Sequence, residues 1–495
     1  MTESTDYVEP THPFPPRYWW LKRIILASIL LALTYAGLMW WWRYEGDCAL
    51  QAEVDAIRAR GEPILIGDFA SKTQVRDEDN AATTLSSAAA AIRMTRPQQN
   101  FVDWFDLDQP IDAGVRNMLS QLSVSTAPSR QLVRQARFQN DVDWGVQLRS
   151  PVISILLPGL NTQRELAEVL SYDALHEHLS GHDAEAVELT RDLVRQADLV
   201  EQYCPVLIAH LVAVAMAARI DQLVRVMSYD LDVQTDPAAT TQPTGPTSAA
   251  QVKALISELL DDTQLRRSWS QSMYGERLLE YDVASHPGSI SAVGNGLPDV
   301  WLLQPMLKLD AVPLLRGTST LANAGTAPDF QTASARAAPR RLDRPTTQPR
   351  ISFLTTALSQ SMGLSDTVLE RHYRGLAWRR IAALRLAIAL YRVDHGGQFP
   401  PQLEDLVPGY LPKLPADPFS ADGRSFGYRP SPQPMLWSVG IDGKDGGGDA
   451  TLPRGHGPTT IPAGHPLDSR QWERADVIFP LKRPDPLPPE PSDGN

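Results

Sequence analysis

The chain has 495 residues and contains little cysteine, no excess of basic charge and hardly any long apolar run. Two cysteines, Cys48 and Cys204, exclude a disulfide framework and a zinc site built from four clustered thiolates. We expect both thiols to be unpaired, and a Cys48–Cys204 bridge is the alternative. The formal net charge of −12 argues against nucleic-acid binding, which requires a basic face. A hydrophobic content of 43% nevertheless allows two or three domains with buried cores.

Motifs that carry common catalytic chemistry are also missing. The sequence contains no G-x-S-x-G nucleophile elbow, no Walker phosphate loop and no G-x-G-x-x-G turn after a strand. His176, His178 and His182 lack the H-E-x-x-H spacing of zinc proteases, and we interpret them as polar residues at a hairpin turn. The sequence therefore predicts no catalytic residue and no cofactor-binding residue, and we expect a protein that is not an enzyme.

The one long apolar run lies near the N-terminus, from Ile24 to Trp42. Its nineteen residues carry no charge, and at ~1.5 Å per residue a helix of this length spans about 28 Å, close to the hydrocarbon core of a bilayer. Tryptophans at both ends are typical of an aromatic belt at the membrane surfaces. A cleaved signal peptide has a shorter apolar core and a small-residue cleavage site, so the run favours an uncleaved, single-pass transmembrane helix.

Charges on either side of this helix predict its orientation. Arg17, Lys22 and Arg23 precede it, whereas acidic residues such as Glu45 follow it closely. Because positively charged flanks stay in the cytoplasm, residues 1–23 are expected to form a cytoplasmic tail. The C-terminal bulk is then expected on the non-cytoplasmic side, with the membrane itself as the first partner.

Apolar side chains recur at helical spacing through much of the remaining chain. The strongest signal lies between Gln163 and Met227, where a turn at Ser180–Asp183 separates two helices. This pattern resembles a tetratricopeptide hairpin, but no 34-residue repeat is sustained, so we expect an irregular helical array and a mostly α fold. The expected organisation is the transmembrane helix at 24–42, a helical region at 43–232 that opens with a short helix at 50–60, a flexible linker at 233–250, further helices at 251–316, a flexible insertion at 317–350, a C-terminal domain at 351–465 and a proline-rich tail at 466–495.

The C-terminal domain carries an ordered set of motifs after a long helix that ends at Asp394. In order, these are a glycine bend at 396–397, Phe399-Pro400, a short helix at 403–407, the run YLPKLPADPF, a strand at 426–428 paired with a strand at 436–439, and the loop GIDGKDGGGD at 440–449. This series resembles the periplasmic C-terminal domain of the major pseudopilin of type II secretion systems. The resemblance implies a small α+β lobe at the end of a mostly helical chain.

Two features depart from the pseudopilin pattern. In that family the hydrophobic helix runs directly into this domain, whereas here the two are separated by the whole helical region. Gly37 is followed by Leu-Met-Trp, without the glutamate of a prepilin peptidase site. We therefore expect a reused module and not a filament subunit. The layout as a whole resembles uncharacterised membrane-anchored bacterial proteins, which implies the bacterial inner (cytoplasmic) membrane and a periplasmic bulk.

The resemblance also implies a calcium site. In pseudopilins the Asp-Gly loop binds calcium, and its acidic ligands correspond here to Asp442 and Asp449, with Val439 supplying a carbonyl and Thr451 a further oxygen. The residue types suit calcium independently, because this ion prefers hard oxygen ligands on a flexible loop. Lys444 stands where an EF-hand requires an acid, so the loop is not an EF-hand. A bound calcium ion would be structural, and the alternative is a solvated Gly-Asp turn.

Three functions remain open on these features. A membrane-anchored envelope scaffold or protein-interaction protein is favoured, because helical arrays offer concave surfaces to partners. An accessory component of a type II secretion or pilus-like apparatus is the alternative that the C-terminal resemblance implies. A second alternative is an envelope hydrolase with a dispersed site, which would require a cleft that brings acids or histidines together.

Overall fold

The structure, a computed structural model, describes residues 18–69, 75–107, 109–152, 155, 157–234, 244–286, 304–338, 366–451 and 471–483. Helix accounts for 66% of the structure, which confirms the mostly α fold class. The α-helices are α1 (Trp19–Ala59), α2 (Ala81–Ala91), α3 (Arg96–Trp104), α4 (Ala113–Arg137), α5 (Pro158–Leu179), α6 (Asp183–Val200), α7 (Leu207–Ser228), α8 (Ala249–Leu260), α9 (Thr263–Ser285), α10 (Gln304–Ala324), α11 (Phe330–Ala337) and α14 (Asp366–Asp394). Short 3-10 turns are η1 (Ile66–Phe69), η2 (Asp77–Asp79), η7 (Leu403–Leu406) and η8 (Gln471–Glu473).

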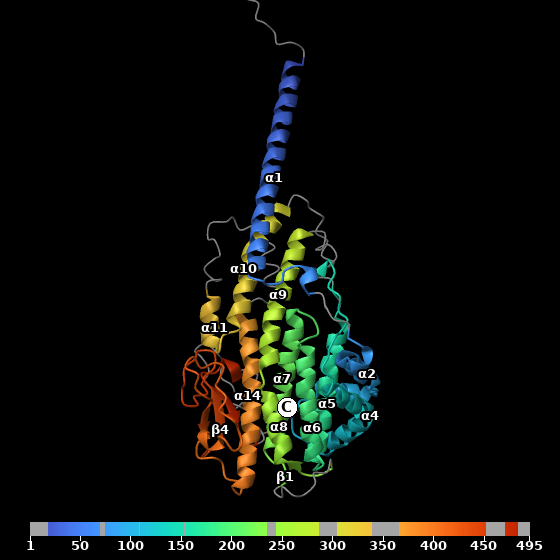
Figure 1. Ribbon diagram of the computed structural model, residues 1–495, viewed down its shortest axis with the longest axis vertical. Coiled ribbons are helices and arrows are strands. Elements are labelled where there is room, and N and C mark those ends of the chain that lie inside the picture. The colour runs from blue at the N-terminus through green and yellow to red at the C-terminus, as the bar shows by residue number, and fades with distance from the viewer. Residues whose placement is uncertain are drawn as a thin grey trace, which may run out of the picture.

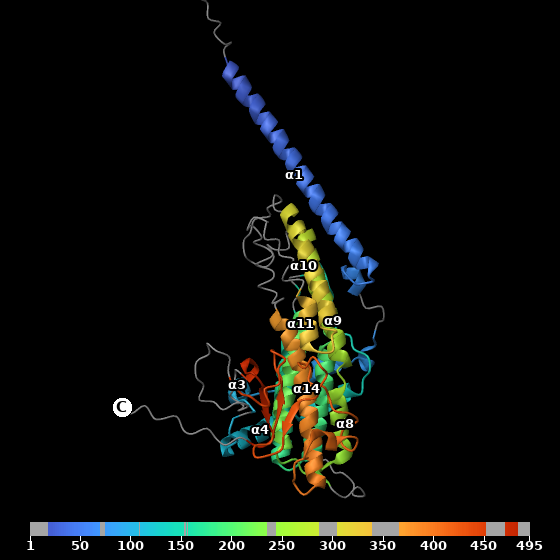
Figure 2. The same cartoon turned by 90° about the vertical axis from the view of Figure 1, so that its left-hand side faces the viewer.

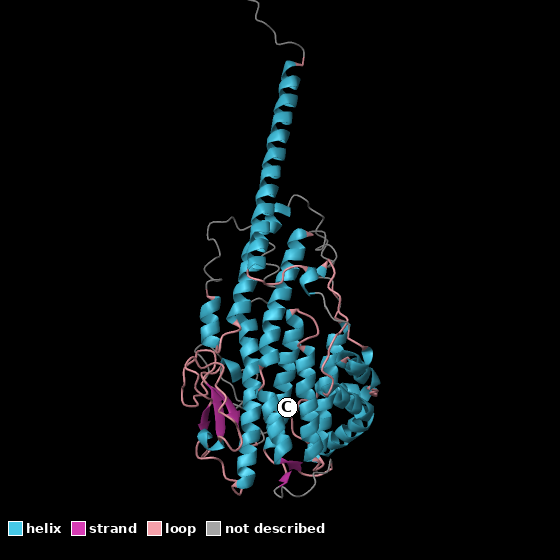
Figure 3. Cartoon of the chain, viewed as in Figure 1, coloured by secondary structure: helices cyan, strands magenta, loops and turns pink. Residues whose placement is uncertain are grey.

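The body of the protein is an elongated bundle whose long helices run roughly along one axis (Figure 1). α14 packs against α7 and α8, α9 contacts α7 and α10, and α5 contacts both α6 and α7. The helices α2, α3 and α4 cover one flank, and a small sheet lies on the opposite flank (Figure 3). One cluster of buried apolar side chains runs through this body, from Leu85 on α2 to Phe479 in the sheet.

The 41-residue α1 projects from one end of the bundle and is inclined away from it (Figure 2). Its first half, as far as Trp42, is almost wholly exposed. Its second half buries one stripe of side chains, at Gly46, Leu50, Val54 and Ile57. Spacings of three and four residues place this stripe on one side of the helix. The stripe packs on α9 and α10 in a small apolar cluster that is separate from the main core.

The continuity of α1 corrects the prediction of a transmembrane helix followed by a separate short helix at 50–60. The charged residues after Trp42 end the apolar run, but this stretch contains no proline and the helix continues through it. Gly46, the glycine in this stretch, allows a close approach of two helices, because a Cβ there would lie 3.2 Å from the carbonyl oxygen of Pro305 on α10. The helix therefore passes from the apolar run into the body without interruption.

Two of the described helices, α1 and α7, are long and apolar enough to cross a membrane. Their surroundings differ, because the most apolar window of α1 is 6% buried and that of α7 is 61% buried. α7 contacts α5, α6, α9 and α14, and it is therefore a core helix of the bundle. Among the residues that the structure describes, only α1 offers an exposed apolar helix of membrane-spanning length.

The C-terminal sheet has the order β3 (Gly427–Arg429), β4 (Met435–Ser438) and β5 (Val477–Pro480), with both pairs antiparallel. The pairing of β3 with β4 was predicted and is confirmed. β5 was not predicted, because it lies inside the stretch 466–495 that we expected to be a tail without packing. Val477, Ile478 and Phe479 are all buried against β4, so a short apolar run in proline-rich surroundings completes the sheet.

The two stretches predicted to be flexible also contain secondary structure. In 233–250, β1 (Val233–Gln234) pairs in parallel with β2 (Thr247–Ser248), and Ser248 caps α8. In 317–350, α10 continues to Ala324 and α11 follows, capped by Asp329. Their Thr- and Ala-rich composition predicts a linker, but serine and threonine hydroxyls here bond to helix backbone. Residues 235–243 and 339–350 of these stretches, with residues 1–17 and 351–365, lie outside the described residues.

Candidate functional site

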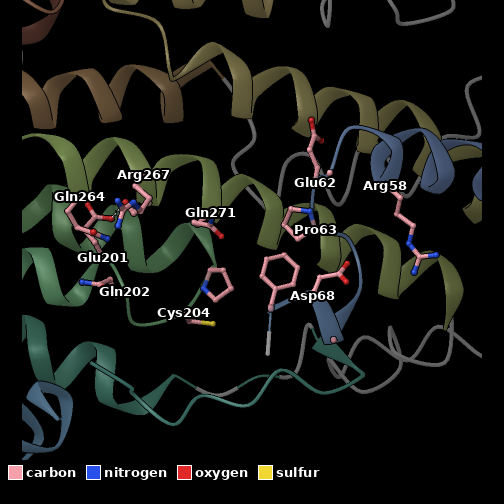
Figure 4. Close-up of a pocket in the computed structure, with 15 residues that line it drawn as sticks. Arg58, Glu62, Pro63, Asp68, Glu201, Gln202, Cys204, Gln264, Arg267 and Gln271 are labelled. Carbon is pink, nitrogen blue, oxygen red and sulfur yellow. Dashed lines mark hydrogen bonds between the residues drawn. The ribbon is translucent and has the colours of Figure 1, made fainter. Parts of the chain in front are cut away.

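A cavity of about 830 Å³ lies where the segment that follows α1 meets the helical body (Figure 4). We call it the junction pocket. Its walls are the segment from Arg58 to Phe69, the loop between α6 and α7, and one face of α9 that presents Gln264, Arg267 and Gln271. Its volume falls within the range of about 300–1,000 Å³ that is usual for ligand pockets.

The segment after α1 is held by a buried arginine of α9. The Arg277 guanidinium donates to Glu62 at 2.5 Å, to the Pro63 carbonyl at 2.6 Å and to the Ser319 hydroxyl at 2.8 Å. Arg60 makes a second ion pair with Glu62, at 3.1 Å. Burial alone would raise the pKa of the Glu62 carboxyl, but the two guanidinium groups outweigh this effect and lower the pKa. The carboxylate therefore stays charged and ties the segment to α9, and Arg277 in turn links α9 to Ser319 on α10.

The far end of the same segment is fixed by its own backbone. The Asp68 carboxylate accepts hydrogen bonds from the backbone N–H groups of Ile64 and Leu65, both at 2.9 Å. These two bonds lower the pKa of Asp68, because they favour the charged form of the carboxyl. This wall of the junction pocket is thus a stabilised turn.

Behind the α9 wall lies a buried chain of polar side chains. Ser268 donates to Glu201, and Nδ1 of His210 lies 3.0 Å from both the Ser268 hydroxyl and the same Glu201 oxygen. Nε2 of His210 lies 3.2 Å from Nδ1 of His372. Burial raises the pKa of the Glu201 carboxyl and lowers the pKa of the His372 imidazole well below its ordinary value. The chain links the pocket wall to α7, α9 and α14.

The geometry of this chain does not suit nucleophilic catalysis. A Ser-His-acid relay needs the hydroxyl and the carboxylate on opposite ring nitrogens, so that the imidazole can pass a proton between them. Here Ser268 and Glu201 both face Nδ1 of His210, and the other nitrogen faces His372. The arrangement satisfies polar groups in the core, and it gives no support to an envelope hydrolase with a dispersed site.

The two cysteines are both free, as predicted. Cys204 lines the junction pocket but is buried, and burial raises the pKa of its thiol to about 12. A thiol at that pKa is not a nucleophile near neutral pH, because the thiolate is the reactive form. Cys48 lies exposed on α1.

The residues predicted to bind calcium lie around one loop, where their polar groups have partners within the protein. Asp442 accepts from the backbone of Lys444 at 2.9 Å, and Asp449 accepts from the backbone and the hydroxyl of Thr451 at 3.0 and 3.1 Å. The backbone N–H of Val439 donates to a buried aspartate at 2.9 Å. No group of three or more His, Cys, Asp or Glu side chains that could hold a metal ion occurs within the described ranges. Calcium binding by this loop stays a prediction that gains no support from the arrangement.

The loop is organised instead by Asp476, which was not predicted as a site residue. Its carboxylate accepts from the backbone N–H groups of Gly446, Gly448 and Asp449 at 3.2, 2.8 and 2.7 Å. Its own N–H donates to the Asp449 carbonyl at 2.8 Å. An aspartate immediately before the apolar run Val477–Phe479 was the available signal, but it lay in a region that we took for an unstructured tail.

The histidine cluster at the α5–α6 turn is a set of ion pairs. His178 lies 2.6 Å from Asp183 and 3.2 Å from Asp230, and His182 lies 2.8 Å from Glu177. The left-handed glycine predicted in this turn is present, since Gly181 has a φ of 79°. The cluster therefore closes a helical hairpin.

Comparison with known proteins gives no family for the chain. No protein-family model, no curated protein and no solved structure matches it. Its function must therefore be argued from the chemistry and geometry of the chain itself.

Proposed function

We propose that the protein is a membrane-anchored scaffold that binds other proteins through its helical body. One observation carries this proposal: α1 exposes an uncharged apolar half and buries a stripe of its other half against α9 and α10. A helix that exposes so much apolar surface needs an apolar environment, which a bilayer supplies. The body it carries is large and helical, and helical arrays offer extended surfaces to protein partners.

The contacts of α1 support a rigid connection between anchor and body. Beyond the tryptophans at 40–42, Arg43 donates to Gln304 at 2.7 Å and Asp47 is paired with Lys308. Two turns further on, Arg316 reaches the Glu53 carboxylate at 2.7 Å. These contacts begin at Arg43, the residue directly after the apolar run, so no flexible linker separates the two parts. A body attached in this way keeps a fixed orientation to the membrane surface.

The sequence flanks support a particular placement for this anchor. The positive charges before the apolar run favour a cytoplasmic N-terminus, and the resemblance of the C-terminal lobe favours the bacterial inner membrane. In this arrangement the helical body and the sheet lie in the periplasm, where they meet envelope proteins.

The anchor can be tested by placing charge in the apolar half of α1. Leu30→Arg/Leu31→Arg is expected to move the full-length protein from the carbonate-resistant membrane fraction to the soluble fraction, because each arginine at the centre of a span costs about 2.5–3.5 kcal/mol. Val124→Arg changes an exposed apolar residue of α4 and serves as the matched control, which should stay in the membrane fraction. If the double variant also resists extraction, α1 is not the anchor.

The scaffold role has its own test. A photo-crosslinking amino acid is placed at exposed positions of the body in living cells, and the adducts are identified by mass spectrometry. We expect the same adducts in repeated experiments at positions that share one face. If no position gives a reproducible adduct, the scaffold role is wrong even where the anchor is right.

A second candidate is an accessory role in a type II secretion or pilus-like apparatus. It is supported by the order of α14, a glycine bend with positive φ at Gly396 and Gly397, and the antiparallel pair β3–β4, which the pseudopilin resemblance predicted. Fold alone does not establish such a role. Unchanged secretion of type II substrates in a deletion strain would remove this candidate.

A further inference from the structure

The α9 wall of the junction pocket presents a row of polar side chains that the protein does not use internally. Gln264, Arg267 and Gln271 follow one another at spacings of three and four residues, which places them on one face of the helix. Arg267 and Gln271 are exposed, and Gln264 is half-buried. Within the part of the chain that the structure describes, none of the three makes a hydrogen bond or an ion pair. Figure 4 shows them along one side of the pocket.

The charged side chains that line the pocket differ in how they are paired. Among the described lining residues, Glu62 pairs with two arginines, and Glu201 bonds to a serine and a histidine. Asp68 accepts from two backbone N–H groups, but it keeps its negative charge, which attracts the Arg58 guanidinium. Arg58 and Arg267, by contrast, have no ion-pair partner among the described residues. Figure 4 shows these two guanidinium groups at opposite ends of the pocket. A ligand therefore meets donors with positive charge at Arg267 and at Arg58, with the Gln271 amide between them and the Gln264 amide beyond Arg267.

The distance from the membrane decides which anion can reach this site. Arg58 lies sixteen residues beyond Trp42, which at ~1.5 Å per residue is about 24 Å along α1. A lipid headgroup at the membrane surface does not extend so far, so the site takes a ligand from the aqueous side.

The amide side chains indicate which kind of ligand fits the junction pocket. A peptide backbone carries a donor and an acceptor at each residue, and a glutamine side chain offers both in return. The row from Gln264 to Gln271 covers about 10 Å, the length of about three residues of extended peptide. We propose that the junction pocket binds an extended, acidic peptide segment of a partner protein. This inference rests on the proposed function, since it names the site at which the scaffold takes its partner.

The test uses the full-length protein in detergent micelles and a displayed library of random twelve-residue peptides. The most enriched peptides are synthesised with a fluorophore, and their dissociation constants are measured by anisotropy. We expect enriched peptides to carry Asp or Glu. Arg267→Gln should weaken their binding about tenfold or more, as expected for loss of a charge-assisted hydrogen bond. The double variant Gln264→Ala/Gln271→Ala should weaken binding severalfold.

Matched controls come from α4, on the far flank of the body. Arg116→Gln and Gln131→Ala change exposed residues of the same types, and both should leave the dissociation constants unchanged. All these substitutions are at exposed or half-buried positions, so equal melting temperatures can be required before binding is compared. Raising the salt concentration should weaken the interaction, because it screens exposed charges.

Several results would overturn the inference. These are a library without enrichment, enriched peptides that lack acidic residues, or equal binding by wild type and Arg267→Gln. Binding of the acidic polysaccharide polygalacturonate in place of any peptide would overturn it as well. A crosslinker at Gln271 separates this failure from failure of the scaffold role. Adducts only at positions such as Gln131 would move the partner site elsewhere and keep the scaffold, whereas no adduct at any position would reject both.

Discussion

Arg277 and Glu62 meet at 2.5 Å, so a wholly buried guanidinium on α9 holds the segment that follows the N-terminal helix. The two residues are far apart in sequence, and their contact joins the segment after α1 to the core of the body. The same guanidinium also binds the Pro63 carbonyl, which leaves this segment little freedom. This buried side chain, which no sequence motif marks, adds to the contacts that fix α1 on the body.

We predict that Arg277→Met destabilises the protein by about 3–5 kcal/mol, because it leaves a largely buried carboxylate with one partner fewer. Urea denaturation of the full-length protein in detergent measures the change. Arg76→Met is the control, since Arg76 pairs with Glu78 at the surface and should lose less than about 1 kcal/mol. If Glu62→Gln/Arg277→Met is no more stable than Arg277→Met, the uncompensated charge is not the reason for the loss.

A second prediction concerns Gly275, where α9 crosses the loop between α6 and α7. A Cβ at this position would lie 1.2 Å from the carbonyl oxygen of Pro205, so a side chain requires the backbone to move. Gly275→Ala should destabilise the protein by about 3 kcal/mol or more, at the upper end of overpacking effects. The melting temperature reports the loss. Gly37→Ala, at a helical glycine with open space around it, should not lower it.

The sequence predicted helices best where their apolar spacing was long and regular. The hairpin of α5 and α6, its turn at Gly181, and the long α14 were predicted within a few residues. Their signals are local, because a helix is fixed by contacts three and four residues apart. The exposed apolar half of α1 was equally predictable, because an uncharged apolar run of this length is typical of a helix that can span a membrane.

Features that depend on distant partners were not predictable. β5 is too short to be recognised alone and forms only because β4 offers an open edge. Asp476 organises the glycine loop through backbone donors that lie far from it in sequence. The junction pocket likewise assembles residues near 60, 200 and 270, and no motif connects these positions. Long-range contacts of this kind produce no periodic pattern of residues in the sequence.

The third prediction concerns Glu276, whose carboxyl group lies in the core. Its carboxylate is buried and accepts from the backbone N–H of Leu207 at 3.0 Å, and burial raises its pKa to about 7. A raised pKa means that the contribution to stability is complete below the ordinary pKa near 4.5 and is lost as the pH rises through 7. Glu276→Gln keeps the acceptor and removes the charge. It should be more stable than wild type at pH 8 by about 2–3 kcal/mol and similar to it below pH 4.5.

Thermal melting between pH 4 and pH 8.5 tests this difference. The melting temperature of the variant should fall less than that of wild type as the pH rises. Parallel curves would show that the Glu276 carboxyl does not titrate in this range in the folded protein. Glu258→Gln, which alters a carboxylate paired with Arg191 near the surface, should not reproduce the gain at high pH.

The last prediction concerns His178. As for Glu276, stability should fall as the pH rises, but at higher pH. Burial opposes its charge, but hydrogen bonds with Asp183 and Asp230 outweigh burial and raise the pKa of the imidazole to about 9. The stabilisation is therefore complete below the ordinary pKa of about 6.5 and is lost as the pH rises through 9, where the imidazole becomes neutral. The loss of folding free energy over this pH range is on the order of 3 kcal/mol.

Thermal melting tests this expectation. Between pH 7 and pH 10 the wild-type melting temperature should fall. His178→Gln should make that fall smaller and should lower stability at pH 6.5. His395→Gln is the control, because His395 lies exposed at the end of α14 without an acidic partner among the described residues, and it should keep the wild-type slope. A His178→Gln curve with the wild-type slope would mean that the α5–α6 turn is held by something other than a charged imidazole between two carboxylates.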